Sequence, residues 1–443
     1  MKTLVYGLGE SGVAAAKALL EREADVAVAD AGDNERLRRT LVDLGVDGQL
    51  AADPRVLGGV DRVVVSPGVK PSDPVIMAAE KAGVAVVSEV GLGLELLGGG
   101  VRVAAVTGTN GKTTVVDMLD RMLEAARVPR AVAGNSWRAL TGCLGEVRRA
   151  GLLILEVSSF QLHYLRNPAF EAAALLNARP DHLNWHASFE EYVQDKLRIF
   201  EGQAAGDLAL VHAADPTGRK AAENLAAKVV VVGEGRTAVR DHRLFLGGDV
   251  LAKAGELRFA GRHNQENALF AAAMAEKVGA PLGGIRAGLL SYELKPHRLQ
   301  VVGQRDGVTY VDDSKATNPA AVAAALGGLE RPVVLILGGS EKHTDFTEIL
   351  SHLGSCRAVL CQGEAGPRLA RFLENSGYPG LVERSRDLGT AVRRAAEHAW
   401  EGDVVLLSPG CASFDQFAGY AERGDEFARL VRGLAAEREA VSS

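Results

Sequence analysis

Two glycine-rich turns in this 443-residue sequence have the residue types and spacing that bind phosphate groups. Residues 107–114, TGTNGKTT, follow an apolar run and precede a helical pattern, so the loop backbone, the Lys112 ammonium and the Thr113 hydroxyl can hold a triphosphate with Mg2+. Residues 7–12, GLGESG, also lie between an apolar run and a helical pattern, and Asp30 ends the next apolar run. The first loop predicts ATP binding. The second predicts a nucleotide diphosphate, which NAD or another nucleotide could supply.

Two charged side chains lie in apolar surroundings, where each needs a partner. Glu156 ends an apolar run at 152–157, and an unpaired carboxylate there would be costly, which favours a Mg2+ ligand over a structural role. Lys196 lies in a helical stretch beside Leu197, Ile199 and Phe200, a poor place for a free ammonium. The alternative for Lys196 is a buried stem with its charged end in water.

The elements that position these residues follow a rhythm of short apolar runs and glycines that is typical of α/β folds. We expect strands in a first block at 4–6, 26–29, 62–65 and 84–87. The three glycines at 98–100 form a linker, after which a second block has expected strands at 101–106, 152–157, 172–176 and 208–211, with helices at about 188–200 and 265–279. Beyond His297, expected strands at 309–314, 332–339, 358–363 and 403–410 predict a third doubly wound sheet.

The predicted fold class is therefore α/β with three domains. Residues 1–97 form a Rossmann-like nucleotide domain, 98–297 a central P-loop ATPase-type domain, and 298–443 a Rossmann-like C-terminal domain. The length is about three times that of a typical domain, so a single small domain is excluded.

Composition excludes several other classes of protein. A hydrophobic content of 47% and a charged content of 24% are ordinary for a globular chain, and a net charge of -6 gives no basic excess for nucleic acid. The four cysteines are too few and scattered for a disulfide scaffold, so we expect reduced core residues. We find no apolar run of membrane-spanning length and no signal-peptide pattern, and we expect a cytoplasmic protein without a membrane partner.

The phosphate loop differs from the standard pattern, because Val106 occupies the position of its first glycine. This variant loop resembles that of the Mur ligases and their folylpolyglutamate synthetase relatives. Further motifs of that family follow in its order along the whole chain: LEVSSFQL (155–162), NARPDHL (177–183), DKLRIF (195–200), HNQEN (263–267), His297-Arg298, DDSKATNP (312–319), GGSEKHTDF (338–346) and SPGCASFDQF (408–417).

The resemblance implies an ATP-dependent amide ligase of peptidoglycan precursor synthesis. The last three motifs look like those of the members that add D-glutamate to UDP-N-acetylmuramoyl-L-alanine through an acyl phosphate, releasing ADP. It also implies two Mg2+ sites and a monomer that binds no nucleic acid. Three alternatives stay open: a ligase of the same family with another amino acid, a nucleotide-binding oxidoreductase built on GLGESG, and an ATP-dependent binding module without catalysis.

The resemblance also assigns catalytic and metal-binding roles. In the family, the lysine at position 196 is carbamylated by CO2, which turns a cation into a carboxylate that helps hold the second Mg2+. Lys315 is a candidate partner of that carbamate. The implied catalytic residues are Lys112, Glu156, His182, Lys196 and Lys315. The implied metal ligands are Thr113, Glu156, His182 and carbamylated Lys196.

The remaining implied site residues fall into three groups. The nucleotide group comprises Gly108, Thr109, Asn110, Gly111, Lys112, Thr113, Thr114, Asn264, Asn267, Arg298 and Asp313. The D-glutamate group comprises Thr317, Lys342, Ser413 and Phe414. The group for the uridine diphosphate substrate comprises Gly9, Glu10, Ser11, Asp30, Ser66, Gly68, Asn135, Ser158 and Gln161.

Three positions depart from the family pattern. Where the family usually has GNIG, this chain has Gly134-Asn135-Ser136-Trp137, which places an indole beside the expected substrate diphosphate. Asn184 follows Asp181-His182-Leu183 where an acidic residue is common, and His343 replaces a small residue.

Overall fold

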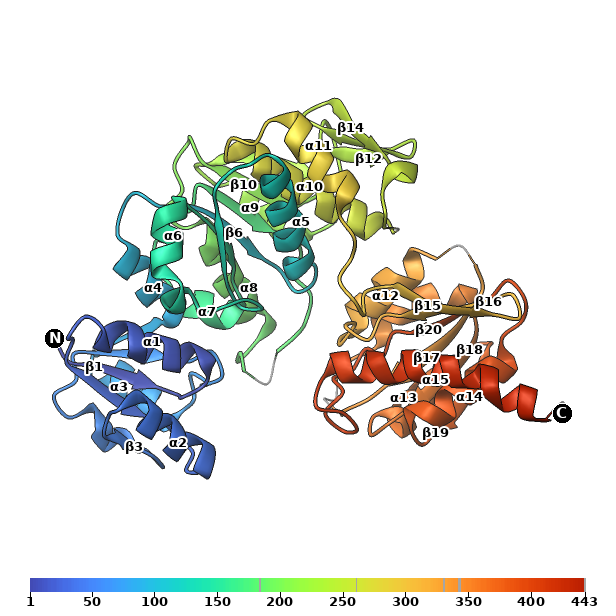
Figure 1. Ribbon diagram of the computed structural model, residues 1–443, viewed down its shortest axis with the longest axis horizontal. Helices are drawn as coiled ribbons and strands as arrows, with labels where there is room; N and C mark the ends of the chain where they lie inside the picture. Colours follow the sequence, from blue (N-terminus) through green and yellow to red (C-terminus); the bar gives the residue numbers. More distant parts are fainter. Residues whose placement is uncertain (183–184, 260, 330, 342–343, 442–443) are drawn as a thin grey trace. The chain divides into compact units, whose positions relative to one another are not determined.

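The computed structural model describes residues 1–182, 185–259, 261–329, 331–341 and 344–441 (Figure 1). The chain divides into two compact units. The first comprises Met1–Leu257 with Asn264–Tyr292, and the second comprises Arg258–His263 with Glu293–Ser443. Among the described residues, no helix combines the length and the apolar character needed to cross a membrane.

The first unit begins with β1 (Thr3–Tyr6), α1 (Glu10–Leu20), β2 (Val26–Ala29), α2 (Glu35–Leu44), β3 (Gly48–Gln49), a 3-10 helix (Pro54–Leu57), β4 (Arg62–Val65), α3 (Pro74–Lys81), β5 (Ala85–Ser88) and α4 (Glu89–Leu97). The strands form a parallel sheet in the order β3-β2-β1-β4-β5, which is the strand order of a doubly wound fold, with its switch point between β1 and β4. β1 and β4 are buried throughout, as expected for strands covered on both faces. Asn34 and Ser88 accept hydrogen bonds that start α2 and α4.

The second sheet of this unit belongs to a segment that contains β6 (Arg102–Thr107), α5 (Lys112–Ala125), β7 (Ala131–Gly134), a 3-10 helix (Leu140–Gly142), α6 (Leu144–Ala150), β8 (Leu152–Glu156), α7 (Ser159–His163), β9 (Ala172–Leu175), α8 (Phe189–Leu197), a 3-10 helix (Arg198–Phe200), β10 (Leu208–His212), α9 (Pro216–Ala222) and β11 (Lys228–Val232). Its six strands are parallel, in the order β11-β10-β9-β6-β8-β7. Because β6 and β8 are neighbours, their carboxyl ends bring the loop after Thr107 close to Glu156.

The rest of this segment contains β12 (Ala238–Arg240), β13 (Arg243–Leu246), β14 (Asp249–Lys253), a 3-10 helix (Ala254–Glu256), α10 (Arg262–Lys277) and α11 (Leu282–Ser291). The three strands form a small antiparallel sheet. α11 packs against α5, the helix that follows the phosphate loop.

The second unit contains β15 (Gln300–Arg305), β16 (Val308–Asp312), α12 (Pro319–Gly327), β17 (Val333–Gly338), a 3-10 helix (Thr347–Ser355), β18 (Cys356–Gln362), α13 (Gly366–Asn375), β19 (Leu381–Ser385), α14 (Leu388–His398), β20 (Val404–Leu407) and α15 (Tyr420–Val441). The sheet order is β15-β16-β20-β17-β18-β19, with β15 antiparallel to β16 and the others parallel. Alternate residues of β17 enter two cores: Leu335 packs with α12 and α13 on one face, and Ile336 packs with α14 and α15 on the other.

The predicted α/β class with three nucleotide-type sheets is confirmed. The first two sheets lie in one compact unit and the third lies in the other. The small antiparallel sheet is not among the predicted elements, because strands of three to five residues leave a weak period-two pattern. All four cysteines lie in described parts of the chain, are buried and form no disulfide, as predicted.

Candidate active site

The phosphate loop connects β6 to α5 and is held in shape by a residue far along the chain. Asn177 Oδ1 accepts a 2.9 Å hydrogen bond from the Asn110 N–H, and its Nδ2 donates to Asn110 O at 3.2 Å. The Thr109 N–H donates to the Asn177 carbonyl at 3.0 Å. Lys112 Nζ curls back over the loop, 2.7 Å from Gly108 O. The loop backbone, Thr113 and Thr114 therefore surround the N-terminus of α5, which is a favourable place for phosphate.

Glu156, at the end of β8, is fully buried and accepts four hydrogen bonds from neutral donors. Its Oε1 accepts from Ser136 Oγ at 2.8 Å and Asn135 Nδ2 at 3.0 Å, and Thr113 Oγ1 lies 3.3 Å away. Its Oε2 accepts from the indole Nε1 of Trp137 at 3.1 Å. These four donors carry no positive charge, and a buried carboxylate oxygen is a ligand type that Mg2+ prefers, so this site suits a divalent cation beside the phosphate loop.

Lys196 approaches the phosphate loop from α8. Its side chain is buried, its Nζ donates to Gly108 O at 3.0 Å, and it lies 4.5 Å from the centre of the Tyr192 ring. Burial holds the pKa of the Lys196 amine well below its usual range, and the charge of Lys112 lowers it further. The Tyr192 hydroxyl in turn lies 2.9 Å from Thr109 Oγ1. Lys196 and Lys112 thus both contact the carbonyl of Gly108.

His182 lies in the loop between β9 and α8, with a left-handed backbone at φ 56°. Its ring is 6.5 Å from that of Tyr192, and its Nε2 is 3.7 Å from Asp181 Oδ2. All four predicted metal-binding residues, Thr113, Glu156, His182 and Lys196, therefore lie at the carboxyl-end edge of the second sheet, in one unit. Asn184, a noted departure from the family pattern, lies outside the described residues.

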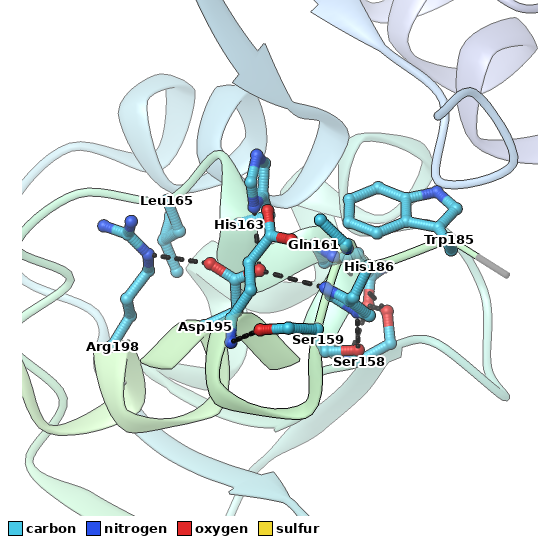
Figure 2. Close-up of polar contacts among 12 residues, drawn as sticks. Ser158, Ser159, Gln161, His163, Leu165, Trp185, His186, Asp195 and Arg198 are labelled. Atoms are coloured by element: carbon cyan, nitrogen blue, oxygen red, sulfur yellow. Dashed lines mark hydrogen bonds and ion pairs between the residues drawn. The ribbon is translucent and has the colours of Figure 1, made fainter. Parts of the chain in front are cut away.

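Asp195, next to Lys196, anchors the end of α8 in a network of basic groups (Figure 2). Its Oδ2 lies 2.7 Å from His163 Nδ1 and 3.3 Å from His186 Nδ1, and its Oδ1 lies 3.2 Å from Arg198 Nε. Burial alone would raise the pKa of Asp195, but the hydrogen bonds from His163, His186 and Arg198 and the charge of His163 lower it to about 2.

The same network reaches the segment that carries predicted substrate residues. His186 Nε2 lies 2.9 Å from Ser159 Oγ at the start of α7 (Figure 2). The preceding residue, Ser158, forms a capping box with Gln161, whose Oε1 accepts from the Ser158 N–H and Oγ, both at 3.0 Å. Asp195 therefore connects α7, the 185–188 segment and the helix that carries Lys196.

A pocket of about 430 Å3 opens within the first unit, between the glycine turn after β1 and the turn after β7. Asp30 lines this pocket and fixes the backbone on both sides of it in the sequence. Its Oδ2 accepts from the Leu8 N–H at 2.7 Å, and its Oδ1 accepts from the Gly32 N–H at 2.8 Å. Ser66 Oγ donates to Gly7 O at 2.6 Å. Eight of the nine residues predicted for the uridine diphosphate substrate line this pocket, together with Trp137: Gly9, Glu10, Ser11, Asp30, Ser66, Gly68, Asn135 and Gln161. Ser158 is not among the lining residues.

The two predicted asparagines lie on α10. A Cβ placed on Gly111 would be 2.8 Å from Asn267 Oδ1, so the Asn267 amide approaches the phosphate loop. Asn264 lies one turn earlier on the helix and is buried.

In the second unit, residues 312–317 and 408–413 meet at the carboxyl ends of β16 and β20, which are neighbouring strands. Ser408 Oγ donates to Asp313 Oδ2 at 2.9 Å, and the Gly410 N–H donates to Ala316 O at 2.9 Å. Burial raises the pKa of Asp313 to about 7, against the opposing effect of hydrogen bonds from Ser408 and Leu299.

The other predicted residues of this unit differ in exposure. Lys315 Nζ lies 3.8 Å from the centre of the Tyr420 ring, and Arg298 and Thr317 are half-buried. Ser413 is buried, whereas the Phe414 side chain is 75% exposed. Lys342, predicted to contact D-glutamate, and His343, a departure from the family pattern, lie outside the described residues.

Sequence analysis missed Arg423, which ties the two loops of this unit together. Its buried guanidinium donates from Nε to Ser314 Oγ at 2.9 Å, from Nη2 to Ser314 O at 2.8 Å and from Nη1 to Cys411 O at 3.1 Å. Burial lowers its pKa to about 10. The available signal was helical spacing, because Arg423 lies four residues before buried Phe427 on the same face of α15.

Comparisons with known proteins agree with this organisation. Family models match along the chain: the Mur ligase MurD-like N-terminal domain over residues 1–88, the Mur ligase middle domain over 106–275, and the Mur ligase glutamate ligase domain over 297–411. The chain belongs to the Mur ligase family.

Its relatives match over almost their whole length. A protein of Rubrobacter xylanophilus is 66% identical, with 99% of each chain covered, and one of Thermobifida fusca is 38% identical, with 98% of each covered. Both are named UDP-N-acetylmuramoylalanine--D-glutamate ligase. The family resemblance predicted from the motifs is confirmed.

Solved structures share the fold at low identity. The chain is similar to a MurF ligase of Thermotoga maritima in complex with ADP, with a TM-score of 0.62, 18% identity and coverage of 93% of this chain and 95% of that one. It is also similar to a pseudomurein peptide ligase type C of Methanothermus fervidus, with a TM-score of 0.60, 17% identity and coverage of 98% and 99%.

Proposed function

We propose that this protein is an ATP-dependent amide ligase that joins D-glutamate to UDP-N-acetylmuramoyl-L-alanine in peptidoglycan precursor synthesis. The alanyl carboxylate of the sugar nucleotide attacks the γ-phosphorus of ATP, forming an acyl phosphate and ADP. The amine of D-glutamate then attacks the acyl carbon, the C–O bond to phosphate breaks, and the nitrogen loses a proton as the amide forms. The products are the extended sugar nucleotide, ADP and inorganic phosphate.

One observation carries the proposal: two buried ionisable groups flank the phosphate loop. Glu156 Oε1 lies 3.3 Å from Thr113 Oγ1 on one side, and Lys196 Nζ lies 3.0 Å from Gly108 O on the other. A loop that binds only nucleotide needs no second ionisable group buried against it. Transfer of a phosphoryl group to a carboxylate does need extra charge compensation, because both reactants are anions.

Each part of the first unit then has a task in the reaction. The loop backbone and Lys112 hold the β- and γ-phosphates, and Thr113 with Glu156 holds Mg2+ beside them. A Mg2+ ion held there would supply positive charge against the phosphate oxygens. Asn267 approaches the loop at Gly111 and supports the nucleotide side of the site.

Lys196 fits a carbamate better than an ammonium. The amine nitrogen attacks the carbon of CO2, an N–C bond forms and one proton leaves, so a cation is replaced by an anion. Such an anion, with His182 in the same region, supplies the oxygen ligand that a second Mg2+ requires. The Lys196 side chain is completely buried and its amine donates to a backbone carbonyl, which supports this assignment, since a buried ammonium is costly.

The pocket of the first unit is the proposed site of the sugar nucleotide. Gly9, Glu10 and Ser11 place the N-terminus of α1 at the pocket, where a diphosphate is favoured. In the second unit, Thr317, Lys342, Ser413 and Phe414 are proposed for D-glutamate, and Arg298 and Asp313 for the nucleotide. Because the proposed substrates are ATP and a uridine diphosphate sugar, we propose that the reaction takes place in the cytoplasm. The net charge of -6 gives no basic excess for a nucleic-acid partner.

An isotope experiment tests the acyl phosphate directly. UDP-N-acetylmuramoyl-L-alanine labelled with 18O in its alanyl carboxylate is incubated with ATP, Mg2+ and D-glutamate, and the released phosphate is analysed by mass spectrometry. The proposed route transfers one 18O atom to phosphate for each amide formed. Amide formation with unlabelled phosphate would contradict the route, and incorporation of another amino acid in place of D-glutamate would overturn only the roles proposed for Thr317, Lys342, Ser413 and Phe414.

A further inference from the structure

The carboxylate of Glu156 has two differently partnered oxygen atoms. Oε1 faces Thr113, Ser136 and Asn135, whereas Oε2 accepts the indole N–H of Trp137 at 3.1 Å. An indole nitrogen is a donor only, so this bond has a fixed direction. Because the acceptor is a buried anion, the bond belongs to the strong, charge-assisted class.

The turn that carries Trp137 is locked to the end of β8. The Asn135 N–H donates to Glu156 O at 2.9 Å, the Gly134 N–H donates to Arg138 O at 3.0 Å, and the Trp137 N–H donates to Gly134 O at 3.0 Å. A Cβ on Gly134 would lie 2.0 Å from Glu156 O, so the two backbones lie too close together for any side chain at position 134. The indole and the carboxylate are therefore held in a set geometry by the main chain as well as by their own bond.

The other side of Trp137 borders the sugar-nucleotide pocket. Trp137 lines the cavity of about 430 Å3, which is also lined by Gly9 and Ser11 of the glycine turn. Its neighbour Asn135 also lines this cavity and donates to Glu156 Oε1. A ligand in the pocket and a cation at Glu156 would therefore both act on the same short turn.

We propose that Trp137 is a positioning residue that couples the sugar-nucleotide pocket to the Mg2+ carboxylate. The indole holds Oε2, which turns Oε1 toward Thr113 and the phosphate loop. A diphosphate in the pocket restrains the indole and so favours this orientation of Glu156. The inference rests on the proposed function, since it requires both a nucleotide-linked cation at Glu156 and a sugar nucleotide in the pocket.

Metal binding tests this coupling without turnover. Mn2+ replaces Mg2+, and the signal of free Mn2+ is followed by electron paramagnetic resonance in the presence of ADP, with and without saturating UDP. In the wild type, UDP should tighten Mn2+ binding several-fold, and by linkage Mn2+ should tighten UDP binding by the same factor. Trp137→Phe keeps a ring in the pocket wall and removes the N–H, so Mn2+ should bind about tenfold more weakly and the effect of UDP should vanish.

The matched control is Trp400→Phe, which removes an indole from the second unit. Trp400 is 64% exposed and packs on the Arg357 guanidinium at 3.8 Å, and its loss should leave both Mn2+ affinity and coupling unchanged. A second measurement needs no variant at the site. In protein labelled with 15N at its three tryptophans, the Trp137 indole resonance should shift on adding UDP and again on adding Mg2+ with ADP.

The possible results distinguish a failure of the Trp137 coupling from a failure of the proposed ligase function. Unchanged Mn2+ affinity and unchanged coupling in a folded Trp137→Phe protein would overturn the inference and leave the proposed ligase standing. A Trp137 indole resonance that shifts neither with UDP nor with Mg2+ and ADP would also overturn the inference and leave the proposed ligase standing. If the wild type binds no Mn2+ with ADP, the proposed metal site at Glu156 is itself wrong, and the inference falls with it.

Discussion

The Nζ atom of Lys196 lies 3.0 Å from the carbonyl oxygen of Gly108, which Lys112 also contacts at 2.7 Å. Two lysines that share one carbonyl repel each other if both are charged, and Lys112 is the one that belongs to the phosphate loop itself. Burial already disfavours the charged form of Lys196. The shared contact with Gly108 explains why Lys196, although it lies in an apolar stretch of α8, belongs to the site around the phosphate loop.

The first prediction concerns that amine. Protein equilibrated with 13C-labelled bicarbonate should show one carbamate carbon resonance, because a neutral buried amine is a nucleophile for CO2. The resonance should be absent in Lys196→Ala, which should also lose more than a hundredfold in kcat, as expected when a group needed for phosphoryl transfer is removed. Lys220→Ala, which alters a lysine of α9, is the control. A carbamate signal that persists in Lys196→Ala would refute the assignment.

The second prediction concerns Asp195, which connects α7 and α8. Asp195→Ala leaves His163, His186 and Arg198 without their shared acceptor, so the free energy of unfolding should fall by about 3 kcal/mol in urea denaturation. The carbamate signal of Lys196 should weaken as well, because the end of α8 is no longer fixed. Glu190→Ala, on the exposed face of the same helix, should cost less than about 1 kcal/mol. Equal losses in the two variants would contradict a special role for Asp195.

The third prediction concerns the tight turn after β7. Gly134 has φ 111°, and its substitution by Ala would place a Cβ 2.0 Å from Glu156 O. Strain and overlap together should lower the free energy of unfolding by about 3 kcal/mol or more. Gly206→Ala is the matched control, since a Cβ there meets nothing within 4 Å. Urea denaturation that shows similar stability for both variants would argue against this geometry.

The fourth prediction follows from the raised pKa of Asp313, about 7, in the second unit. Between pH 4 and pH 7 the folded state keeps a proton that the unfolded chain releases, so stability falls as pH rises through this window. The loss is complete above pH 7, where folded Asp313 must be ionised while buried. Asp313→Asn keeps the shape without the charge. Its melting temperature should exceed that of the wild type by more at pH 8 than at pH 4, where Asp313 is protonated in the folded state and largely protonated in the unfolded state. An equal difference at both pH values would contradict this linkage.

Much of the fold is predictable because its strands are continuous apolar runs. β17 is buried at every position, and such a run between glycines indicates a parallel strand covered on both faces. The phosphate loop is predictable for a similar reason, since its glycines, Lys112 and Thr113 are consecutive. Glu156 was found because a carboxylate at the end of an apolar strand is unusual.

The contacts that shape the site could not be predicted from the sequence, because they join segments far apart in it. Asn177 holds Asn110 across 67 residues, and Arg423 holds Ser314 across 109. Nothing in the local pattern around either residue specifies its partner. The role of Trp137 is of the same kind: the sequence placed its indole beside the substrate, and the fold shows that its N–H points to Glu156.

The measurement that tests the central claim most directly is phosphate release from ATP and Mg2+ with UDP-N-acetylmuramoyl-L-alanine, in the presence and absence of D-glutamate. The account predicts release that depends on D-glutamate, one phosphate for each amide detected by mass spectrometry, and none with L-glutamate. Release that is indifferent to D-glutamate, or no release with any amino acid, would contradict the assignment of this protein as a D-glutamate ligase.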